Sequence, residues 1–333
     1  MEPKDAQATL FDARRVGPAA LTAQVSEAAA ALCARWGGRL LLGTSSWSFP
    51  GWAGLVWDRE YPQPMLSRHG LPAYSAHPLL RTVSLDRALY RPMAADEYAR
   101  LALQVPDDFR FVVKAPAEVC DATQRDPRTG APVAPNPAFL DPGLAVTACA
   151  RPAAAGLRDK LGVLVFQLSP LPSHWLAAEP AFHEQLAAVW RAIRPELPLH
   201  TVLALELRDA SLLTPALAQH LREHGVRSCL GLHDRLPAID EQLPLQRAQW
   251  PGDLVCRWSL QRGQRYAQAR ARWAPFDRLQ APDVATRATL ARVAAATLNA
   301  GRTAFITINN KAEGSAPLSV LELALALLAQ PMP

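Results

Sequence analysis

The side chains best suited to chemistry in this sequence lie at the ends of short apolar runs. Glu206 and Arg208 are two residues apart in LALELRD, so in a β-strand both would point to the same face. A carboxylate there could act as a general acid or base whose pKa neighbouring cations set, or it could be a permanently ionised anchor for Arg257. If the protein is an enzyme, Glu206 is the candidate acid or base, and Lys114 is the second catalytic candidate. Lys114, Arg208 and Arg257 would then hold negative charge.

Polar residues also follow the other apolar runs of the chain. The predicted ligand-binding residues are Thr44, Ser45, Trp47, Asp86, Tyr90, Gln167, Arg208, Arg257, Asn309 and Asn310. Buried polar groups must be paired, and an unpaired buried charge costs several kcal/mol, as a rough magnitude. So many polar strand ends favour one small anionic or polyhydroxylated ligand that they bind together. A layer of salt bridges that satisfy one another is the alternative.

Eight runs have the composition of buried strands and alternate with longer helical patterns. The predicted strands cover residues 39–44, 81–85, 109–115, 161–168, 201–207, 226–232, 253–259 and 303–309. The helical patterns cover residues 94–105, 179–194, 214–225, 281–301 and 316–330. Alternation of this kind predicts a parallel sheet with right-handed crossovers, and eight parallel strands close a barrel whose carboxyl ends share one mouth.

The predicted fold class is therefore α/β, as a single TIM-type (β/α)8 barrel with an N-terminal helical extension. A doubly wound open sheet competes, but GTSSWSFPGW after the first strand is not the Gly-rich phosphate turn of such sheets. Residues 1–37 are expected to form the extension, helical or partly disordered, and residues 38–333 the barrel. The Pro-rich residues 121–143 are expected to form a long loop that could cover the mouth.

Composition argues against several classes of protein. The net charge is +5, but the arginines stand among acidic residues, as in RARWAPFDR, so a nucleic-acid partner is possible but not favoured, although folding could gather them. Five cysteines without a CxxC pair indicate free thiols and a cytoplasmic location. No apolar stretch approaches the roughly 18 residues of a membrane span, so we expect no membrane association. Asp86, Glu206, His233 and Asp234 could bind a metal, but no HExxH or comparable ligand spacing is present, so no metal site is predicted, and the cofactor is unknown.

Five segments resemble a known family. LGTSSWSFPGWAGLVW, DFRFVVKAP, GVLVFQLSP, LALELRDAS and FITINNKAEGSAP are similar, in this order, to motifs of the YecE-like family, domain of unknown function 72. The resemblance implies a TIM-type barrel and no established reaction. Residues that fall on the family's motifs are Gly43, Thr44, Ser45, Trp47, Lys114, Gln167, Glu206, Arg208, Asn309 and Asn310. Ser84 stands where the family commonly has a glutamate and Ser259 where it has a histidine, so two proton-transfer groups are absent.

The sequence is also compatible with two other functions. Trp47, Trp52 and exposed arginines could form a stacking and phosphate surface for nucleic acid. The chain could also be a catalytically inactive scaffold that uses residues 1–37 as its interaction element.

Overall fold

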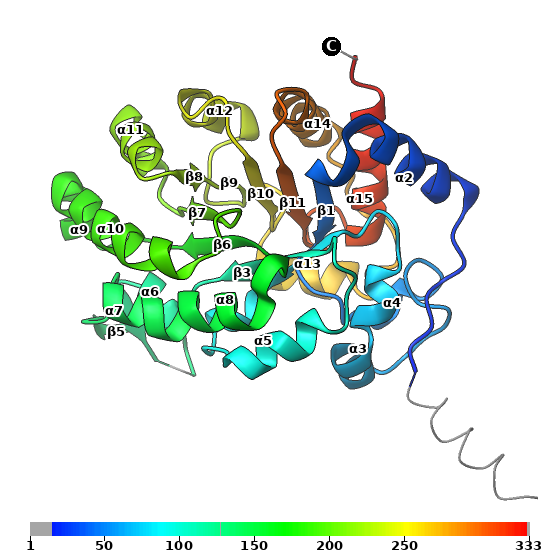
Figure 1. The fold of residues 1–333 in the computed structure, drawn as a ribbon, viewed down its shortest axis with the longest axis horizontal. Coiled ribbons are helices and arrows are strands. Elements are labelled where there is room, and N and C mark those ends of the chain that lie inside the picture. The colour runs from blue at the N-terminus through cyan, green and yellow to red at the C-terminus, as the bar shows by residue number, and fades with distance from the viewer. Residues whose placement is uncertain (1–14, 127, 332–333) are drawn as a thin grey trace, which may run out of the picture.

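The barrel is the centre of the structure, a computed structural model that describes residues 15–126 and 128–331. Nine parallel strands curl into a nearly closed barrel surrounded by helices (Figure 1). The strands are β1 (Leu40–Thr44), β2 (Thr82–Leu85), β3 (Arg110–Lys114), β6 (Leu161–Gln167), β7 (Val202–Glu206), β8 (Val226–Ser228), β9 (Leu230–Leu232), β10 (Leu254–Trp258) and β11 (Ala304–Ile308). Their order is β8-β7-β6-β3-β2-β1-β11-β10-β9. The predicted TIM-type α/β barrel is confirmed.

The two ends of this sheet are neighbours along the chain. The predicted strand 226–232 is split at Cys229 into β8, which pairs with β7, and β9, which pairs with β10. The Cys229 amide still donates to the Leu205 carbonyl at 2.8 Å. One predicted strand therefore supplies both edges, and the barrel is nearly closed because a single residue separates them.

Helices pack around the outside of the barrel. They are α2 (Ala23–Trp36), α3 (Gln63–His69), α4 (Leu71–Ser75), α5 (Ala95–Ala102), α6 (Ala117–Cys120), α7 (Pro142–Ala145), α8 (Arg151–Leu157), α9 (Ser173–Ala177), α10 (Glu179–Ile193), α11 (Pro215–Glu223), α12 (Ile239–Ala248), α13 (Tyr266–Trp273), α14 (Val284–Asn299) and α15 (Ala316–Leu328). Each of the five predicted helical patterns of the barrel contains one of them. In the described residues no helix is long and apolar enough to pass through a membrane.

The N-terminal helix α2 is docked on the barrel. Arg35 Nη1 donates to the Gln330 carbonyl at 2.9 Å, and Trp36 Nε1 donates to Asn299 Oδ1 at 2.8 Å. The helix ends at Gly37, whose φ of 60° is readily adopted by glycine. Residues 1–14 of the predicted extension lie outside the described residues, and the division between residues 37 and 38 stays a prediction.

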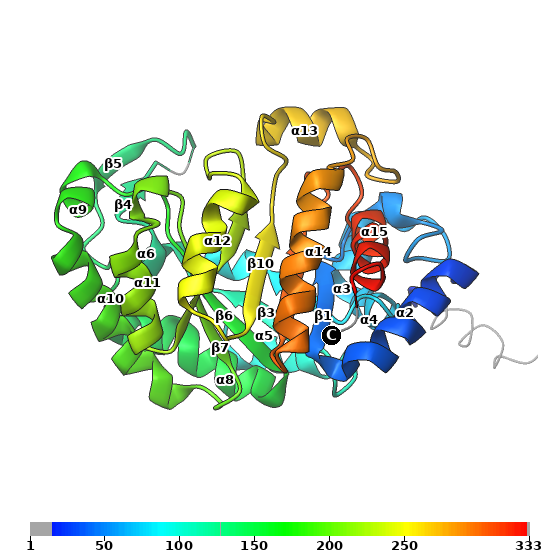
Figure 2. The same ribbon diagram turned by 90° about the horizontal axis from the view of Figure 1, so that it is seen from above.

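The segment after β3 is more ordered than the predicted long loop. Within residues 121–143 an antiparallel hairpin forms from β4 (Thr123–Arg125) and β5 (Pro132–Pro135). Asp121 Oδ2 holds Arg125 Nε at 2.6 Å. Figure 2 shows the hairpin and α13 at the same end of the barrel, where the strands finish. The composition of this segment hid the hairpin because two of its four β5 residues are proline.

The interior of the barrel changes from apolar to polar along the strands. An apolar cluster fills the inside, formed by Leu41, Val112, Val163, Val165, Ala204, Cys229, Val255 and Phe305. Strand side chains alternate between faces, so residues two positions beyond these also point inward. At the carboxyl ends those residues include Lys114, Gln167, Glu206, Gly231 and Arg257. The two-residue period of these strands therefore places a polar side chain, or a glycine, in one layer inside the barrel at its carboxyl end.

Candidate functional site

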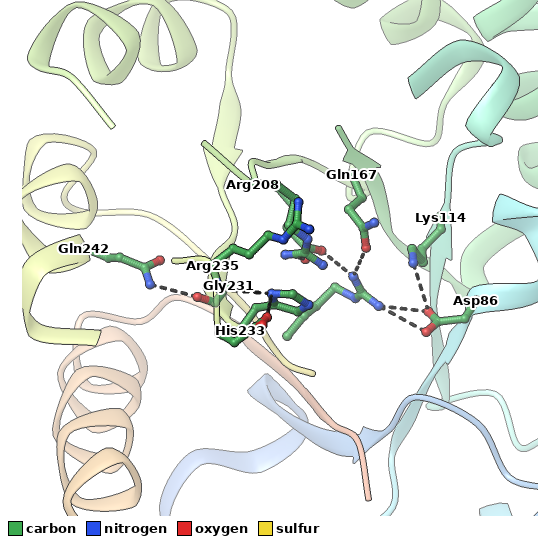
Figure 3. A network of polar contacts seen from close by, with 11 residues as sticks. Asp86, Lys114, Gln167, Arg208, Gly231, His233, Arg235 and Gln242 are labelled. Atoms are coloured by element: carbon green, nitrogen blue, oxygen red, sulfur yellow. Dashed lines mark hydrogen bonds and ion pairs between the residues drawn. The ribbon is translucent and has the colours of Figure 1, made fainter. Parts of the chain in front are cut away.

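Arg257 is the centre of a charged cluster at the carboxyl end of the barrel. Figure 3 shows Asp86, Lys114, Gln167 and Arg208 of this cluster. From β10 Arg257 Nη1 donates to Gln167 Oε1 on β6 at 3.0 Å and to Glu206 Oε2 on β7. Its Nη2 donates to Asp86 Oδ1 at 3.0 Å, just after β2. Burial disfavours the charge of Arg257, but Glu206 and Asp86 outweigh this and raise its pKa. One guanidinium thus contacts side chains from β6, β7 and the turn that follows β2.

Glu206 is fully buried and held between two arginines. Arg208 Nη1 lies 2.5 Å from Glu206 Oε1, while Arg257 contacts Oε2. Burial alone would raise the pKa of Glu206, but the positive charges of Arg208, Arg257 and Lys114 outweigh it and lower the pKa to about 2. The carboxylate is therefore ionised at neutral pH, and of the two roles that the sequence left open, the geometry favours the ionised anchor.

Lys114 is the cation of the cluster with the most distant carboxylate partner. Its side chain is 6% exposed, and its Nζ lies 3.9 Å from Asp86 Oδ1, beyond hydrogen-bond distance. Within the described residues this ammonium group has an ion-pair partner but no hydrogen bond. Burial and the like charge of Arg257 lower the pKa of Lys114 to about 8, although Asp86 and Glu206 act in the opposite direction. A buried lysine of this kind can hold an anion or transfer a proton near neutral pH.

The charges of the cluster do not balance. Three cations, Lys114, Arg208 and Arg257, face two carboxylates, Asp86 and Glu206, which leaves one excess positive charge. Asp86 is also the most accessible of the five, since its side chain is 31% exposed. The cluster is therefore an electropositive layer that reaches solvent beside Asp86 and the half-buried Gln167.

Neighbouring groups extend the cluster in ways that the sequence did not predict. Ser84 Oγ donates to Asp86 Oδ1 at 2.6 Å and so orients that carboxylate. A Cβ atom at Gly231 would lie 2.7 Å from Leu236 Cδ1 and 3.7 Å from both Arg208 Nη1 and Glu206 Cγ, so glycine allows Leu236 to pack closely beside the ion pair. Both residues follow the two-residue period of the interior face, which is the signal that could have identified them.

His233 and Asp234 form a second polar contact at the mouth, with Nδ1 and Oδ1 2.5 Å apart. Burial and then the charge of Arg208 lower the pKa of His233. Figure 3 shows His233 beside Arg208 and Arg235. No group of three or more His, Cys, Asp or Glu side chains among residues 15–126 and 128–331 has the geometry to hold a metal ion.

The remaining predicted residues lie apart from the Arg257 cluster or serve the fold. Thr44 is buried and its Oγ1 contacts the Tyr74 hydroxyl at 2.9 Å. The Ser45 amide donates to the Ile308 carbonyl at 3.1 Å. Asn309 Oδ1 accepts from Lys311 Nζ at 3.1 Å, and Tyr90 is 83% exposed at the rim. Their ligand-binding role stays a prediction.

Asn310 and the tryptophans after β1 hold the barrel wall together. Asn310 Oδ1 accepts from Trp52 Nε1 at 3.1 Å and from the Ala316 amide at 2.8 Å, which joins the β1 loop to the start of α15. Trp52 is fully buried and Trp47 is 5% exposed, with its Nε1 bonded to the Leu66 carbonyl. The expected stacking surface of Trp47 and Trp52 is therefore wrong, because neither ring is available to a base.

Comparison with known proteins agrees with this architecture. The model of the family "Protein of unknown function DUF72" matches residues 41–332. The chain belongs to this family. Members of known structure include a DUF72 protein of Enterococcus faecalis V583, 18% identical, with a TM-score of 0.57 over 88% of this chain and 97% of that one. A DUF72 protein of Thermotoga maritima MSB8 is also 18% identical, with a TM-score of 0.53 over 86% and 98%.

The similarity of DUF72 structures to this chain concerns the fold, because identity is only 18%. Among curated proteins none matches the chain. The side chains of the carboxyl-end cluster are therefore the basis on which a function can be inferred.

Proposed function

We propose that the carboxyl-end cluster of this DUF72 protein binds a small anion and that Lys114 is the group that contacts it. The observation that carries the proposal is a buried ammonium group that forms no hydrogen bond with the described residues, in a layer with one excess positive charge. A buried charge needs a partner, and an anion that accepts hydrogen bonds from Lys114 would supply one. Charge-assisted hydrogen bonds of this kind contribute about 1.5–3 kcal/mol each.

The other members of the cluster suit an organic ligand that carries hydroxyl groups. Asp86 and Gln167 lie at the accessible edge, and their oxygen and nitrogen atoms can bind hydroxyl groups. Arg208 and Arg257 remain committed to Glu206 and keep the layer positive. The best-fitting ligand is therefore a small polyhydroxylated anion, such as a sugar phosphate or sugar acid.

If the protein catalyses a reaction, we infer that Lys114 is its proton-transfer group. A general acid or base works best when its pKa lies near the working pH, and Lys114 has a pKa of about 8. Glu206 has a pKa of about 2 and would remain ionised. Its contribution would be to fix the two arginines in place.

Calorimetric titration with phosphate, sulfate and glucose 6-phosphate tests the proposal. Lys114→Met is expected to weaken the binding of the best of these anions by at least about tenfold, since one charge-assisted hydrogen bond is lost. Lys160→Met is the matched control, because Lys160 is also largely buried but bonds to the Ala102 and Val105 carbonyls. Equal affinities for the two variants would contradict the role of Lys114.

A further inference from the structure

The segment that follows β10 carries most of the net positive charge of the chain. Residues 261–278 contain five arginines and one aspartate, an excess of four positive charges, whereas the whole chain has a net charge of +5. The remaining 315 residues are thus nearly neutral. The expectation that the arginines are dispersed among acids is wrong for this segment.

These arginines are exposed and unpaired. Arg262, Arg265, Arg270, Arg272 and Arg278 are all exposed, and none forms an ion pair with any residue of the described part of the chain. Some exposed arginines elsewhere pair with acids, as in the Arg151–Glu196 and Arg91–Glu97 pairs. We call these five arginines together with Tyr266 the α13 surface.

The α13 surface is held firmly on the barrel. Ala269 and Trp273, on the inner side of α13, are buried in a small apolar cluster with Leu260 and Phe276, against which Phe49 packs. The Gln261 amide donates to the Lys311 carbonyl at 3.0 Å. Figure 2 shows α13 lying across the carboxyl end of the barrel. The arginines therefore stand on an anchored element at the mouth.

An aromatic ring accompanies the arginines. Tyr266 is 55% exposed, and Lys311 Nζ lies 4.3 Å from the centroid of its ring. Tyr90 is 83% exposed, and desolvation, followed by the charges of Tyr266 and Asp86, raises its pKa. Two exposed phenol rings thus lie near each other beside the cationic segment.

We propose that the α13 surface binds the sugar–phosphate backbone of a nucleic-acid strand, with Tyr266 stacking against a base. Unpaired guanidinium groups bind phosphates bidentately, and sequence-independent binding of single strands combines such charges with exposed aromatic rings. The charge complementarity of five arginines calls for a polyanion rather than a single small anion. The surface is separate from the buried Lys114 cluster, and the inference does not depend on the proposed anion site.

Fluorescence anisotropy with labelled single-stranded DNA and RNA oligonucleotides of about 20 nucleotides tests the proposal. Three to five phosphate contacts predict that log K falls with log salt concentration with a slope of about −2 to −3.5. The triple variant R265Q/R270Q/R272Q is expected to bind at least about tenfold more weakly at 50 mM salt, with a slope shallower by about 2. Tyr266→Ala should lose about fivefold or more in affinity without a change in slope.

The control removes the same charge from other helices. Arg68, Arg222 and Arg247 lie on α3, α11 and α12 and are likewise exposed without ion pairs in the described residues, so R68Q/R222Q/R247Q should bind within about threefold of the wild type. The single variants R270Q and R272Q, each with a slope shallower by about 0.7, serve if the triple variant does not fold. Absence of oligonucleotide binding at 50 mM salt overturns the proposal. Equal losses in the two triple variants, or binding to phosphatidylserine vesicles but not to oligonucleotides, also overturn it.

Discussion

The guanidinium of Arg257 on β10 contacts the carboxylate of Glu206 on β7 across the inside of the barrel, and the two side chains are 3% and 0% exposed. β10 and β7 are not neighbours in the sheet, because β8 and β9 lie between them. Inside the barrel, the ion pair therefore joins the strands on either side of the gap between β8 and β9. Such a pair adds little net stability over an apolar one but is severely damaged when one partner is removed.

Glu206→Gln is expected to lower the free energy of unfolding by about 3–5 kcal/mol, because Arg208 and Arg257 would keep buried charges without their carboxylate. Urea unfolding followed by circular dichroism measures this. Glu196→Gln is the control, since the Arg151–Glu196 pair lies on the surface and should matter little. A loss for Glu206→Gln no larger than that for Glu196→Gln would show that the cluster does not need the carboxylate.

Anion affinity is expected to depend on pH through Lys114. Its pKa of about 8 means that the ammonium form dominates below pH 7 and is lost as pH rises through 8. Sulfate affinity, which we choose because sulfate keeps its charge over this range, should fall about tenfold between pH 7 and 9.5. Lys114→Arg should abolish the dependence, because arginine stays protonated. Titration calorimetry at four pH values provides the measurement.

Lys311 is the internal control for that experiment. Burial, followed by the charge of Arg270, lowers the pKa of Lys311 to about 8 as well. Its Nζ lies against Asn309 and the Tyr266 ring rather than in the Arg257 cluster. Lys311→Gln should keep the pH dependence of the wild type, and its disappearance in that variant would assign the titrating group to Lys311 instead.

The strands could be predicted from sequence because each is a short apolar run between polar or Gly-rich segments. The interior half of the site also follows from sequence, since Lys114, Gln167, Glu206 and Arg257 lie two or four residues after an interior apolar residue. Thr44 and Asn310 stand at odd-numbered spacings from the interior residues of their segments. Their side chains point out of the barrel, toward Tyr74 and Trp52 respectively. Applying that period strictly would have separated them from the ligand-binding set.

Burial and charge pairing could not be predicted in the same way. The indole N–H of the buried Trp52 is satisfied by Asn310, which lies 258 residues later in the chain and accepts its hydrogen bond. The arginines of RARWAPFDR have an aspartate nearby in sequence, yet Asp277 pairs with none of them in the described structure. Both features depend on contacts between distant segments, and a local pattern does not contain that information.

The two neighbouring amides of the β11 loop are expected to differ in their contribution to stability. Asn310→Ala removes the acceptor of both Trp52 Nε1 and the Ala316 amide, and should lower the free energy of unfolding by about 2–4 kcal/mol because buried donors are left unsatisfied. Asn309→Ala should have a smaller effect, since Asn309 is only half-buried. Thermal and urea unfolding of the two variants compare them, and an equal or larger loss for Asn309→Ala would refute the structural role of Asn310.

Acid stability is expected to depend on a stack of histidines between α10 and α11. The rings of His183 and His220 are stacked with centroids 4.7 Å apart, and His224 lies 4.7 Å from His220. Burial, followed by the charges of His183 and His224, lowers the pKa of His220 to about 4, although Glu223 and Glu184 oppose this shift. Burial also lowers the pKa of His183, and Glu179 opposes that shift.

Between pH 6.5 and 4 the unfolded chain binds more protons than the folded protein, so the free energy of unfolding decreases as pH falls through this window. His220→Gln should reduce that loss by about 1 kcal/mol, a value discounted for partial exposure. Urea unfolding at pH 7, 6, 5 and 4.5 measures this loss of stability, and His200→Gln is the control because His200 is exposed. If the free energy of unfolding falls equally with pH in the wild type and both variants, His220 is not the group responsible.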